Sequence, residues 1–593
     1  MFALWIAEIR RFRWLALAAG LLLTGTLLFV DRLADALLQP LSTYRLAAAV
    51  CALVGLGLGL YQASSYRRTS QWITLIHRPI APVRILAALG LAGGATLMVV
   101  TILPVLLMLS AHQAGSGSAP DSRHWLLPGA AWLIGMIGYL AGLYLVLAPR
   151  RYGWLAMIPA LLPAVSGAAG WQALAVQAAV MLVLAAMVAT VFKPDLDGPP
   201  RTGVALAATA LAVATGAWAV GTIVGDLAFQ TIWIATGTDP LNGEAPRGGI
   251  VEASRADGQA LIAAALMPSK APEARLWREQ AALSEVFRID PLATDWPERG
   301  ALTNMGAIRF TDPDRHIEWT FRHDDMRFHG RATATKRRGG VLGLGDDNKP
   351  LGQPPLVIDD GRLLMASGMA AFDKASGRID PLLTLPPTRV IASPPVTIGD
   401  AVALLTNRDL RLYDARMLED GDRLYPVQAV LPLPGPVGSL MRIDLIELLD
   451  GYLAVFTFGR DINSPDATWQ AVLRIDDRHR VTRIAERRLT PDYPALSRFA
   501  SWWLSPSLAT VRDAIVATSS DRHPLTVRRN DPPPGIIWML ALTLSLASAA
   551  ATWWRAQSWR IARGRAAFWS IATLLIGLPM LVALVLIRPA PRR

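Results

Sequence analysis

Residues 203–225 read GVALAATALAVATGAWAVGTIVG, an uncharged apolar run long enough to cross a bilayer, and the polar block 226–534 follows it directly. Eight further stretches of the same kind lie towards the two ends of the chain. None of the nine carries Asp, Glu, Lys, Arg or His in its interior. Transport driven by protons or ions usually places an ionisable residue in the membrane, so the energy for any transport is expected to come from elsewhere. The predicted spans are 14–30, 46–62, 85–110, 129–148, 154–169, 172–192, 203–225, 535–553 and 567–587.

The composition indicates a membrane part joined to a globular part. Of 593 residues, 52% are hydrophobic and 18% charged, and the mean hydropathy is +0.34. The net charge of +12 comes largely from Arg beside the apolar spans. No basic helix or aromatic-interleaved patch indicates nucleic acid. The single cysteine, Cys51, excludes a disulfide framework or a cysteine metal site within one chain, and no cofactor is expected.

Basic residues in the short connections set the orientation. With the N-terminus inside, the inner connections are basic and the short outer ones hold only Arg32, Arg45 and Arg123. The block 226–534 is then on the outer side of a multi-pass protein of the bacterial cytoplasmic membrane. The first stretch lacks a signal-peptide cleavage site and is expected to be retained. The inner basic residues are Arg10, Arg11, Arg13, Arg67, Arg68, Arg78, Arg84, Arg150, Arg151, Lys193, Arg201, Arg555, Arg560, Arg563 and Arg565.

Two details of this topology stay open. Pro159 and Pro163 interrupt the stretch 154–169, so this stretch and 172–192 form either two full spans or a re-entrant hairpin. The C-terminal Arg588, Arg592 and Arg593 disagree with the rule, because nine spans would put them outside.

The polar block has the patterns of β-strands. Residues 316–321 alternate polar and apolar side chains, Asp324-Asp325 indicates a turn, and 326–328 alternate again, which predicts a hairpin. A pattern of a Gly turn, an apolar strand and a second strand ending in a bulky residue and Asp then recurs at 361–373, 399–414 and 451–476, the last with a polar insertion at 461–468. A period near 40 residues favours β-propeller blades, with an irregular β-sandwich as the alternative. Residues 251–300 are expected to be helical or mixed.

The connection between the second and third spans, residues 66–79, predicts a short amphipathic helix. Its apolar residues Trp72, Leu75, Ile76 and Pro79 fall on one face at helical spacing. The simple interpretation is a connector with basic anchors at lipid headgroups. The polar remainder of the segment consists of Arg67, Arg68, Gln71, Thr74 and Arg78.

This segment resembles the one between the second and third spans of ABC-2-type permeases, the membrane subunits of ABC transporters. The residues that match that family's pattern are Trp72, Leu75, Ile76, Pro79, Ile80, Arg84 and Ile85. The chain departs from it at Ser70, Ile73 and Leu89, where Gly, Glu and Lys are common, and the resemblance covers only the first six spans. It implies a coupling helix that docks into a separate ATPase subunit, and an assembly of two permease halves with two ATPases. The coupling residues it implies are Arg67, Arg68, Trp72, Leu75, Ile76, Pro79 and Arg84.

Other motifs do not indicate catalysis. The chain has no G-x-x-x-x-G-K-[ST] loop, so ATP would have to bind to a partner. Gly55, Gly57 and Gly59 predict a helix-packing stripe rather than a phosphate loop. Residues 336–340, 346–347 and 359–360 are interpreted as turns. His316, His323 and His329 beside Asp324-Asp325 are weak metal ligand candidates, because the pattern puts them on a strand face and beside a turn, and no metal is expected. Neither a G-x-S-x-G elbow nor an H-E-x-x-H helix occurs, so no enzyme is expected.

The sequence therefore predicts an α-helical polytopic membrane protein with a large β-rich extracytoplasmic domain. The expected parts are a transmembrane domain at 1–225, the β-rich domain at 226–534 and a transmembrane hairpin at 535–593. The expected function is the permease subunit of an ATP-driven exporter, contacting lipid and, at the outer domain, another envelope protein. The alternative is a membrane-anchored β-propeller that binds or senses a ligand.

Overall fold

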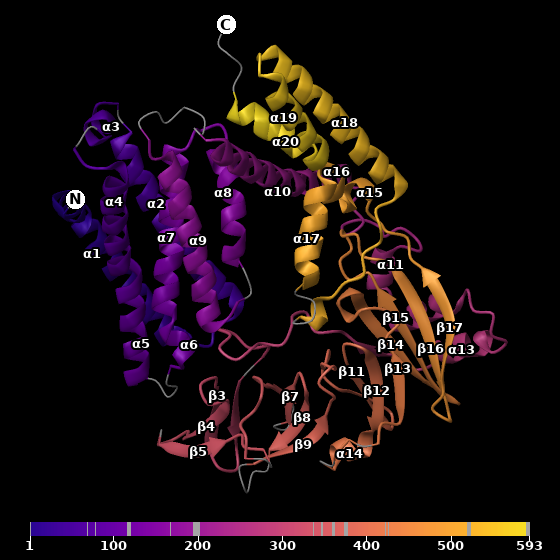
Figure 1. The fold of residues 1–593 in the computed structure, drawn as a ribbon. Coiled ribbons are helices and arrows are strands. Elements are labelled where there is room, and N and C mark those ends of the chain that lie inside the picture. Colours follow the sequence, from indigo (N-terminus) through magenta and orange to yellow (C-terminus); the bar gives the residue numbers. More distant parts are fainter. Residues whose placement is uncertain are drawn as a thin grey trace.

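The computed structural model has a group of long helices on one side and a β-rich region on the other (Figure 1). It describes residues 2–67, 69–76, 79–115, 120–165, 168–193, 202–306, 308–335, 337–345, 348–358, 362–372, 378–420, 423–424, 426–518 and 523–588. Several residues discussed above lie outside these ranges: Arg68, Arg78, Arg201, Lys336, Asp346-Asp347, Asp359-Asp360, Arg592 and Arg593.

Seven helices in the described ranges are long and apolar enough to cross a membrane, so the chain has a multi-pass membrane part. They overlap seven of the nine predicted spans, and several extend well beyond them. The last of the N-terminal set, α10, continues to Thr236, where Gly237 ends it in the left-handed conformation (φ 68°). The seven are α1 (Phe2–Leu33), α2 (Leu41–Tyr66), the continuous run Pro82–Ala114, the run Ser122–Leu147, α9 (Gly170–Val191), α10 (Gly203–Thr236) and α18 (Gly535–Ser558). The first run lies within α4 (Pro82–Leu97), a π-helical turn (Met98–Ile102) and α5 (Leu103–Gly115), and the second consists of α6 (Ser122–Trp125) and α7 (Leu127–Leu147), joined by Leu126.

The other two predicted spans are broken helices. Residues 154–169 form α8 (Gly153–Leu161) and a 3-10 turn (Leu162–Val165), because the two prolines remove amide donors from the helix. The backbone of Gly170, where the chain turns into α9, lies against Gly300 of the β-rich region. The connection therefore reaches the β-side end of the bundle. Residues 567–587 form α19 (Arg563–Ile576) and α20 (Leu578–Ile587), separated by Gly577 at φ 86°.

Close packing of α2 on α7 forms the centre of the bundle. A β-carbon added to Gly55 would lie 1.9 Å from the Gly135 carbonyl oxygen, and one added to Gly59 would lie 2.1 Å from the Tyr139 carbonyl oxygen. Gly57 faces open space. The predicted helix-packing stripe is therefore confirmed for Gly55 and Gly59, where only glycine lets the backbones approach so closely.

In the part of the β-rich region that the structure describes, the strands form four antiparallel sheets, none of them closed into a barrel. Each central hairpin coincides with one sequence pattern: β3–β4 is the hairpin predicted at 316–328, and β7–β8, β11–β12 and β15–β16 are the three recurring copies. The first sheet holds β2 (Arg309–Asp312), β3 (Ile317–Arg322), β4 (Arg327–Ala332) and β5 (Arg338–Leu342). The second holds β6 (Leu356–Ile358), β7 (Arg362–Met365), β8 (Gly368–Phe372) and β9 (Ile379–Thr384). The third holds β10 (Val396–Ile398), β11 (Ala401–Leu405), β12 (Asp409–Asp414) and β13 (Ala429–Pro432). The fourth holds β1 (Phe287–Ile289), β14 (Leu440–Leu448), β15 (Gly451–Phe458), β16 (Trp469–Asp476) and β17 (Val481–Arg488). The interpretation of residues 336–340 as a turn is corrected in part, because Arg338 to Gly340 begin β5.

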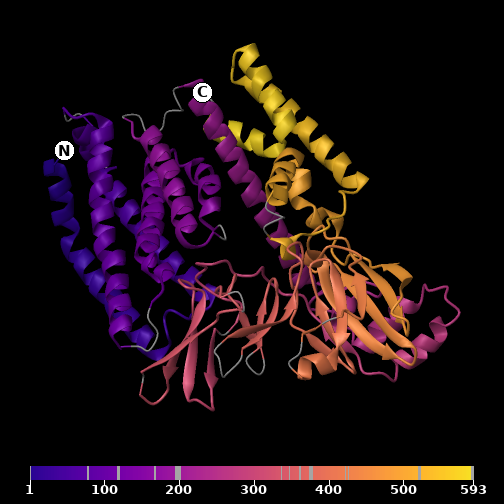
Figure 2. The same ribbon diagram turned by 60° about the horizontal axis from the view of Figure 1, so that its bottom comes forward.

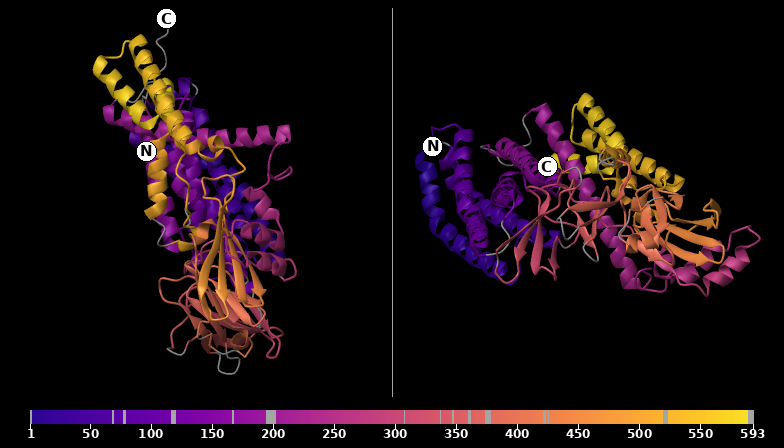
Figure 3. Two further views of the ribbon diagram at one scale, coloured as in Figure 1. Left: turned by 90° about the vertical axis from the view of Figure 1, so that its right-hand side faces the viewer. Right: turned by 90° about the horizontal axis from the view of Figure 1, so that it is seen from below.

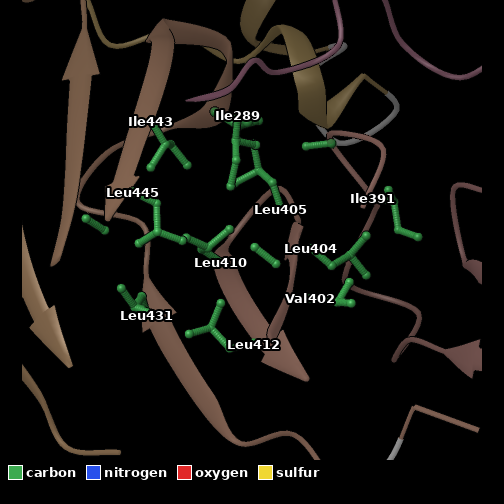
Figure 4. Close-up of a cluster of buried hydrophobic side chains, with 14 of the residues drawn as sticks. Ile289, Ile391, Val402, Leu404, Leu405, Leu410, Leu412, Leu431, Ile443 and Leu445 are labelled. Carbon is green, nitrogen blue, oxygen red and sulfur yellow. The ribbon is translucent and has the colours of Figure 1, made fainter. Parts of the chain in front are cut away.

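The sheets follow one another in chain order, forming an arc below the helices (Figures 1 and 2). One apolar core joins the first and second sheets, and a larger one joins the second, third and fourth. Figure 4 shows part of the larger core, where side chains of the third sheet gather opposite Ile289, Ile443 and Leu445 of the fourth. The outer face of the fourth sheet is covered by three helices, as the helical expectation for 251–300 requires. These are α11 (Ile250–Arg255), α12 (Gly258–Leu266) and α13 (Ala274–Ala281).

The end of the 226–534 block is helical and packs on membrane helices. The Trp218 indole of α10 donates to the Ser501 carbonyl over 2.9 Å, and Ser507 Oγ donates to the Leu575 carbonyl of α19 over 2.8 Å. The Leu504 carbonyl oxygen lies 2.8 Å from where a β-carbon of Gly577 would be. The helices are α15 (Ala495–Arg498), α16 (Ala500–Leu504) and α17 (Pro506–Thr518), and a further one, α14 (Ala415–Glu419), follows β12.

Replacing Gly59 with Ala is expected to destabilise the protein by about 1–3 kcal/mol or more, because the new methyl group overlaps the Tyr139 carbonyl. Gly57→Ala is the matched control, since nothing lies near its added β-carbon. Thermal unfolding of the purified protein in detergent measures both. Equal stability of the two variants would contradict the α2–α7 packing.

Candidate functional site at the α3 end of the helical bundle

The short helix predicted in 66–79 is present as α3 (Thr69–Ile76). It lies at the end of the bundle away from the β-rich region (Figure 1). It follows α2 after a turn at Arg67, and α4 begins six residues after it, at Pro82. The position is that of a connector between two long helices.

The apolar side of α3 is buried in protein and does not face lipid. Trp72 is 7% exposed and Leu75 is 2% exposed. The Trp72 ring lies 5.2 Å from the Phe192 ring at the end of α9, edge to face. A cavity of only about 10 Å³, enough for one water at most, remains between Trp72, Leu75 and the side chains of α2, α4 and α7. A displacement of α3 therefore has to move or deform the bundle beneath it.

Of the remaining predicted coupling residues, one binds the helical bundle and two are exposed. Arg67 Nη1 donates to the Val146 carbonyl at the end of α7 over 2.7 Å. Pro79 and Arg84 are exposed, as is Gln71 on the outer side of α3. Ile76 ends α3, and its side chain, like Arg68, lies outside the described residues. The structure thus brings Arg67, Trp72 and Leu75 together and leaves Pro79 and Arg84 accessible.

A buried polar network lies next to the Trp72 pocket. Glu8 of α1 is 3% exposed and accepts hydrogen bonds from the Gln62 amide (2.7 Å) and the Tyr66 hydroxyl (2.5 Å) of α2. The Tyr139 hydroxyl of α7 donates to Gln62 Oε1 over 2.6 Å. Arg11 Nη1 lies 3.8 Å from Glu8 and donates to Ser65 Oγ over 3.1 Å. The network fastens α1, α2 and α7 together directly beneath α3.

Sequence reasoning missed this network. The predicted first span, 14–30, excludes Glu8, whereas α1 begins at Phe2 and runs as one helix to Leu33. Leu4, Glu8, Phe12, Ala16 and Gly20 recur every four residues and are its buried positions. That spacing puts Glu8 on the inward face of α1 and is the signal that could have revealed it. The predicted stretches are free of charge as delimited, but the helices that contain them bury ionisable residues, among them Glu8 in α1 and His112 in α5.

The opposite end of the bundle is bound to the first sheet by a second polar cluster. Asp121 precedes α6 and is 3% exposed; it accepts from the His323 backbone amide over 3.2 Å. Arg123 of α6 pairs with Asp121 (3.2 Å) and donates to the Ala301 carbonyl (2.5 Å). The Ser122 hydroxyl donates to Asp324 over 2.5 Å. Burial raises the pKa of Asp121, and Arg123 opposes that rise. Burial, with Arg123 nearby, lowers the pKa of His323 to about 3, so its imidazole stays neutral.

A third cluster completes this clamp between helices and sheet. His112 of α5 lies 2.8 Å from Asp31 Oδ1 and 3.9 Å from Asp35 Oδ1. These three are the group in the described residues whose ligand atoms lie close enough for a metal ion. Arg309 of β2, however, pairs with Asp35 over 3.0 Å and with Glu318 over 3.2 Å. The cluster thus joins α1, α5 and the α1–α2 connection to β2.

The three histidines weighed as metal ligands occupy different places. His323 Nδ1 accepts from the Gly300 amide, and its Nε2 bonds Asn304. His329 pairs with Asp325 over 2.7 Å. His316 lies in the turn before β3 with φ 53°.

Comparison with protein-family models, with curated proteins and with solved structures finds no match to this chain. Any functional conclusion therefore depends on the site geometry and on the sequence resemblance.

Replacing Glu8 with Ala is expected to lower the free energy of unfolding by about 2–4 kcal/mol, because it leaves the Gln62 amide and the Tyr66 hydroxyl buried without their acceptor. Arg10→Ala, on the exposed side of the same helix, is the control and is expected to be neutral. Chemical unfolding in detergent compares the two. A Glu8→Ala protein as stable as Arg10→Ala would show that the network does not hold the helices together.

Proposed function

We propose that the chain is the membrane-spanning permease subunit of an ATP-driven ABC transporter, an exporter, energised by a separate ATPase subunit. The observation that carries the proposal is the double role of the α3 segment. Its apolar side chains Trp72 and Leu75 are buried in the bundle, while Gln71, Pro79 and Arg84 remain accessible. A segment built this way can bind a partner on one side and move the helices on the other.

The path for that movement is the α2–α7 pair. α2 leads from the Asp35–Arg309 clamp to Arg67 and α3, and α7 leads from the Asp121–His323 contact to the Val146 carbonyl that Arg67 binds. Because the two backbones pack without intervening side chains at Gly55 and Gly59, the pair is stiff. The ATPase would act at one end of this pair and the β-rich region would respond at the other. Two permease halves and two ATPases, as the family resemblance implies, complete the assembly.

We also propose a topology with the β-rich region on the extracytoplasmic side of the cytoplasmic membrane. The C-terminal α19 and α20 then form a re-entrant hairpin. α19 has 14 residues, which at 1.5 Å each is about 21 Å and too short for a core of about 30 Å. Its tip at Gly577 meets Leu504, so the broken backbone is surrounded by protein, as apolar surroundings require. This arrangement puts Arg588 on the same side as Arg563 and removes the one disagreement with the positive-inside rule.

The alternative is a membrane-anchored binding or sensing protein. The observation that favours it is the arc of four sheets, each with four or five strands, stacked in chain order like blades of an open propeller. Such an arc presents large surfaces to a ligand or an envelope partner. Whether the chain associates with an ATPase distinguishes the two proposals, because a binding or sensing protein does not require an ATPase.

The transporter proposal predicts that a P-loop ATPase encoded by a neighbouring gene co-purifies with the chain. Arg84→Glu is expected to weaken this association about tenfold, because it reverses an exposed charge at the contact. Trp72→Ala is expected to leave the ATPase bound and to uncouple ATP hydrolysis from transport, because it empties the pocket beside Phe192. Trp171→Ala, which removes a 70% exposed Trp on α9, is the control. If no ATPase co-purifies, and both variants behave as wild type in intact cells, the transporter proposal fails and the sensor is favoured.

The topology predicts that a reporter fused to the C-terminus lies on the same side as one inserted after Arg563. Protease added on the other side should remove the β-rich region from intact spheroplasts. Side-specific labelling of cysteines introduced at Gly564 and Arg588 provides an independent measurement. A C-terminal reporter on the side of the β-rich region would instead support a full crossing by residues 567–587.

A further inference from the structure

The two ends of the β arc differ. The fourth sheet is covered by α11–α13 through an apolar core. The first sheet, β2–β5, buries one face against the second sheet. The inward side chains of that face are Trp319, Phe321, Phe328 and Leu342. Its outer face is polar and partly exposed. By strand alternation, this outer face carries Arg309, Thr311, Glu318, Thr320, Arg322, Arg327, His329, Arg331, Arg338 and Val341.

Positive charges are set opposite one another on this outer face. Arg322 is directly across from Arg327 in the β3–β4 register, and Arg331 is across from Arg338 in the β4–β5 register. Like charges in such cross-strand positions repel at a separation of about 5 Å. The acidic groups at this face in the described residues are Glu318, which pairs with Arg309, and Asp325 of the β3–β4 turn, which pairs with His329. The face therefore carries excess positive charge.

Three of these arginines, Arg322, Arg327 and Arg338, have donors that no described residue accepts from. The Arg327 Nε is buried and has no hydrogen-bond partner in the described structure. For Arg322 and Arg338, the described residues provide no hydrogen bond or close ion pair to the guanidinium group. The planar guanidinium group of Arg can donate two parallel hydrogen bonds to the oxygens of a phosphate or a carboxylate. An anion between Arg322 and Arg327 would relieve the repulsion between the two guanidinium groups.

The outer face lies beside the ends of the membrane-length helices, which the proposed topology puts at the membrane surface. Arg309, at its edge, lies 3.0 Å from Asp35 in the α1–α2 connection. Arg322 lies close enough to Asp121, at the start of α6, to act on its charge. Figures 2 and 3 show this sheet beside the ends of α1 and α5. Phosphates at that depth are those of lipid headgroups.

We propose that the outer face of β2–β5, centred on Arg322 and Arg327, binds the phosphate headgroups of anionic membrane lipid. The headgroup phosphate accepts from both guanidinium groups, and the glycerol or acyl part contacts the neighbouring helix ends. This contact holds the first sheet against the membrane surface and adds to the clamp at Asp35 and Asp121. It holds whether or not the chain is a transporter.

Photo-crosslinking in vesicles tests the proposal. A photoreactive amino acid at Thr320, on the outer face, is introduced into the full chain, which is reconstituted in equimolar phosphatidylglycerol and phosphatidylcholine. Adducts are identified by mass spectrometry. We expect adducts with phosphatidylglycerol in excess over phosphatidylcholine, and a roughly tenfold lower yield in the Arg322→Gln/Arg327→Gln variant, since two charge-assisted contacts are lost. A photoreactive amino acid at Leu449, a 92% exposed position on the fourth sheet, should give no such preference.

Two controls keep the result interpretable. Arg275→Gln, which removes an 85% exposed charge at the far end of the arc, should leave the Thr320 adducts unchanged. Higher ionic strength should reduce them in the unmodified chain, so the test does not depend on the double variant folding. Equal yields with both lipids, or adducts to a protein instead, would overturn the proposal. Loss of the adducts when inorganic phosphate is added at constant ionic strength would also overturn it, in favour of a soluble anion.

Discussion

The structure depends on the direct backbone contact between α2 and α7. At Gly55 and Gly59 a β-carbon would overlap carbonyl oxygens of α7, so the two helices pack at a distance that only glycine permits. Everything else in the bundle is arranged around this pair. Glu8 of α1 binds Gln62 and Tyr66 of α2, Tyr139 of α7 binds Gln62, and Trp72 of α3 fills the space at their common end. At the other end, the connections into α2 and α7 bind the first sheet through Asp35 and Asp121.

This arrangement gives the chain a stiff element with accessible residues at each end. At the α3 end, accessible residues lie beside the buried Trp72 and Leu75, and this is where we propose that an ATPase binds. The other end holds a sheet whose outer face is basic. The charge-free stretches by themselves favour an energy source other than an ion gradient for any transport. The buried Glu8 does not change this inference, because its carboxylate accepts hydrogen bonds from Gln62 and Tyr66 in the network that joins three helices.

Patterns within a few residues could be read from the sequence, and contacts between distant residues could not. The hairpin at 316–328, the three repeated hairpins, α3 and the glycine stripe all follow from local periodicity and turn residues. Glu8 was missed because its partners are more than fifty positions away, and its own helix looked apolar only from residue 14. The break at Gly577 was missed because the flanking residues are apolar on both sides. Helices α15–α17 are too short, or too poorly patterned, to stand out from a β-rich block. Whether the sheets form a ring or an arc depends on what covers the last faces, here three helices at one end and polar side chains at the other.

The central claim is that movement imposed on α3 is carried rigidly through α2 and α7 to the first sheet. Pulsed electron paramagnetic resonance tests it with spin labels at three exposed positions, Gln71 on α3, Thr311 on β2 and Gly564 on α19, in the reconstituted complex with its ATPase. When the ATPase is trapped with bound ATP, we expect the Gln71–Thr311 distance to stay unchanged and the Gln71–Gly564 distance to shift. A Gln71–Thr311 distance that changes or broadens, or two distances that both stay fixed, would contradict it.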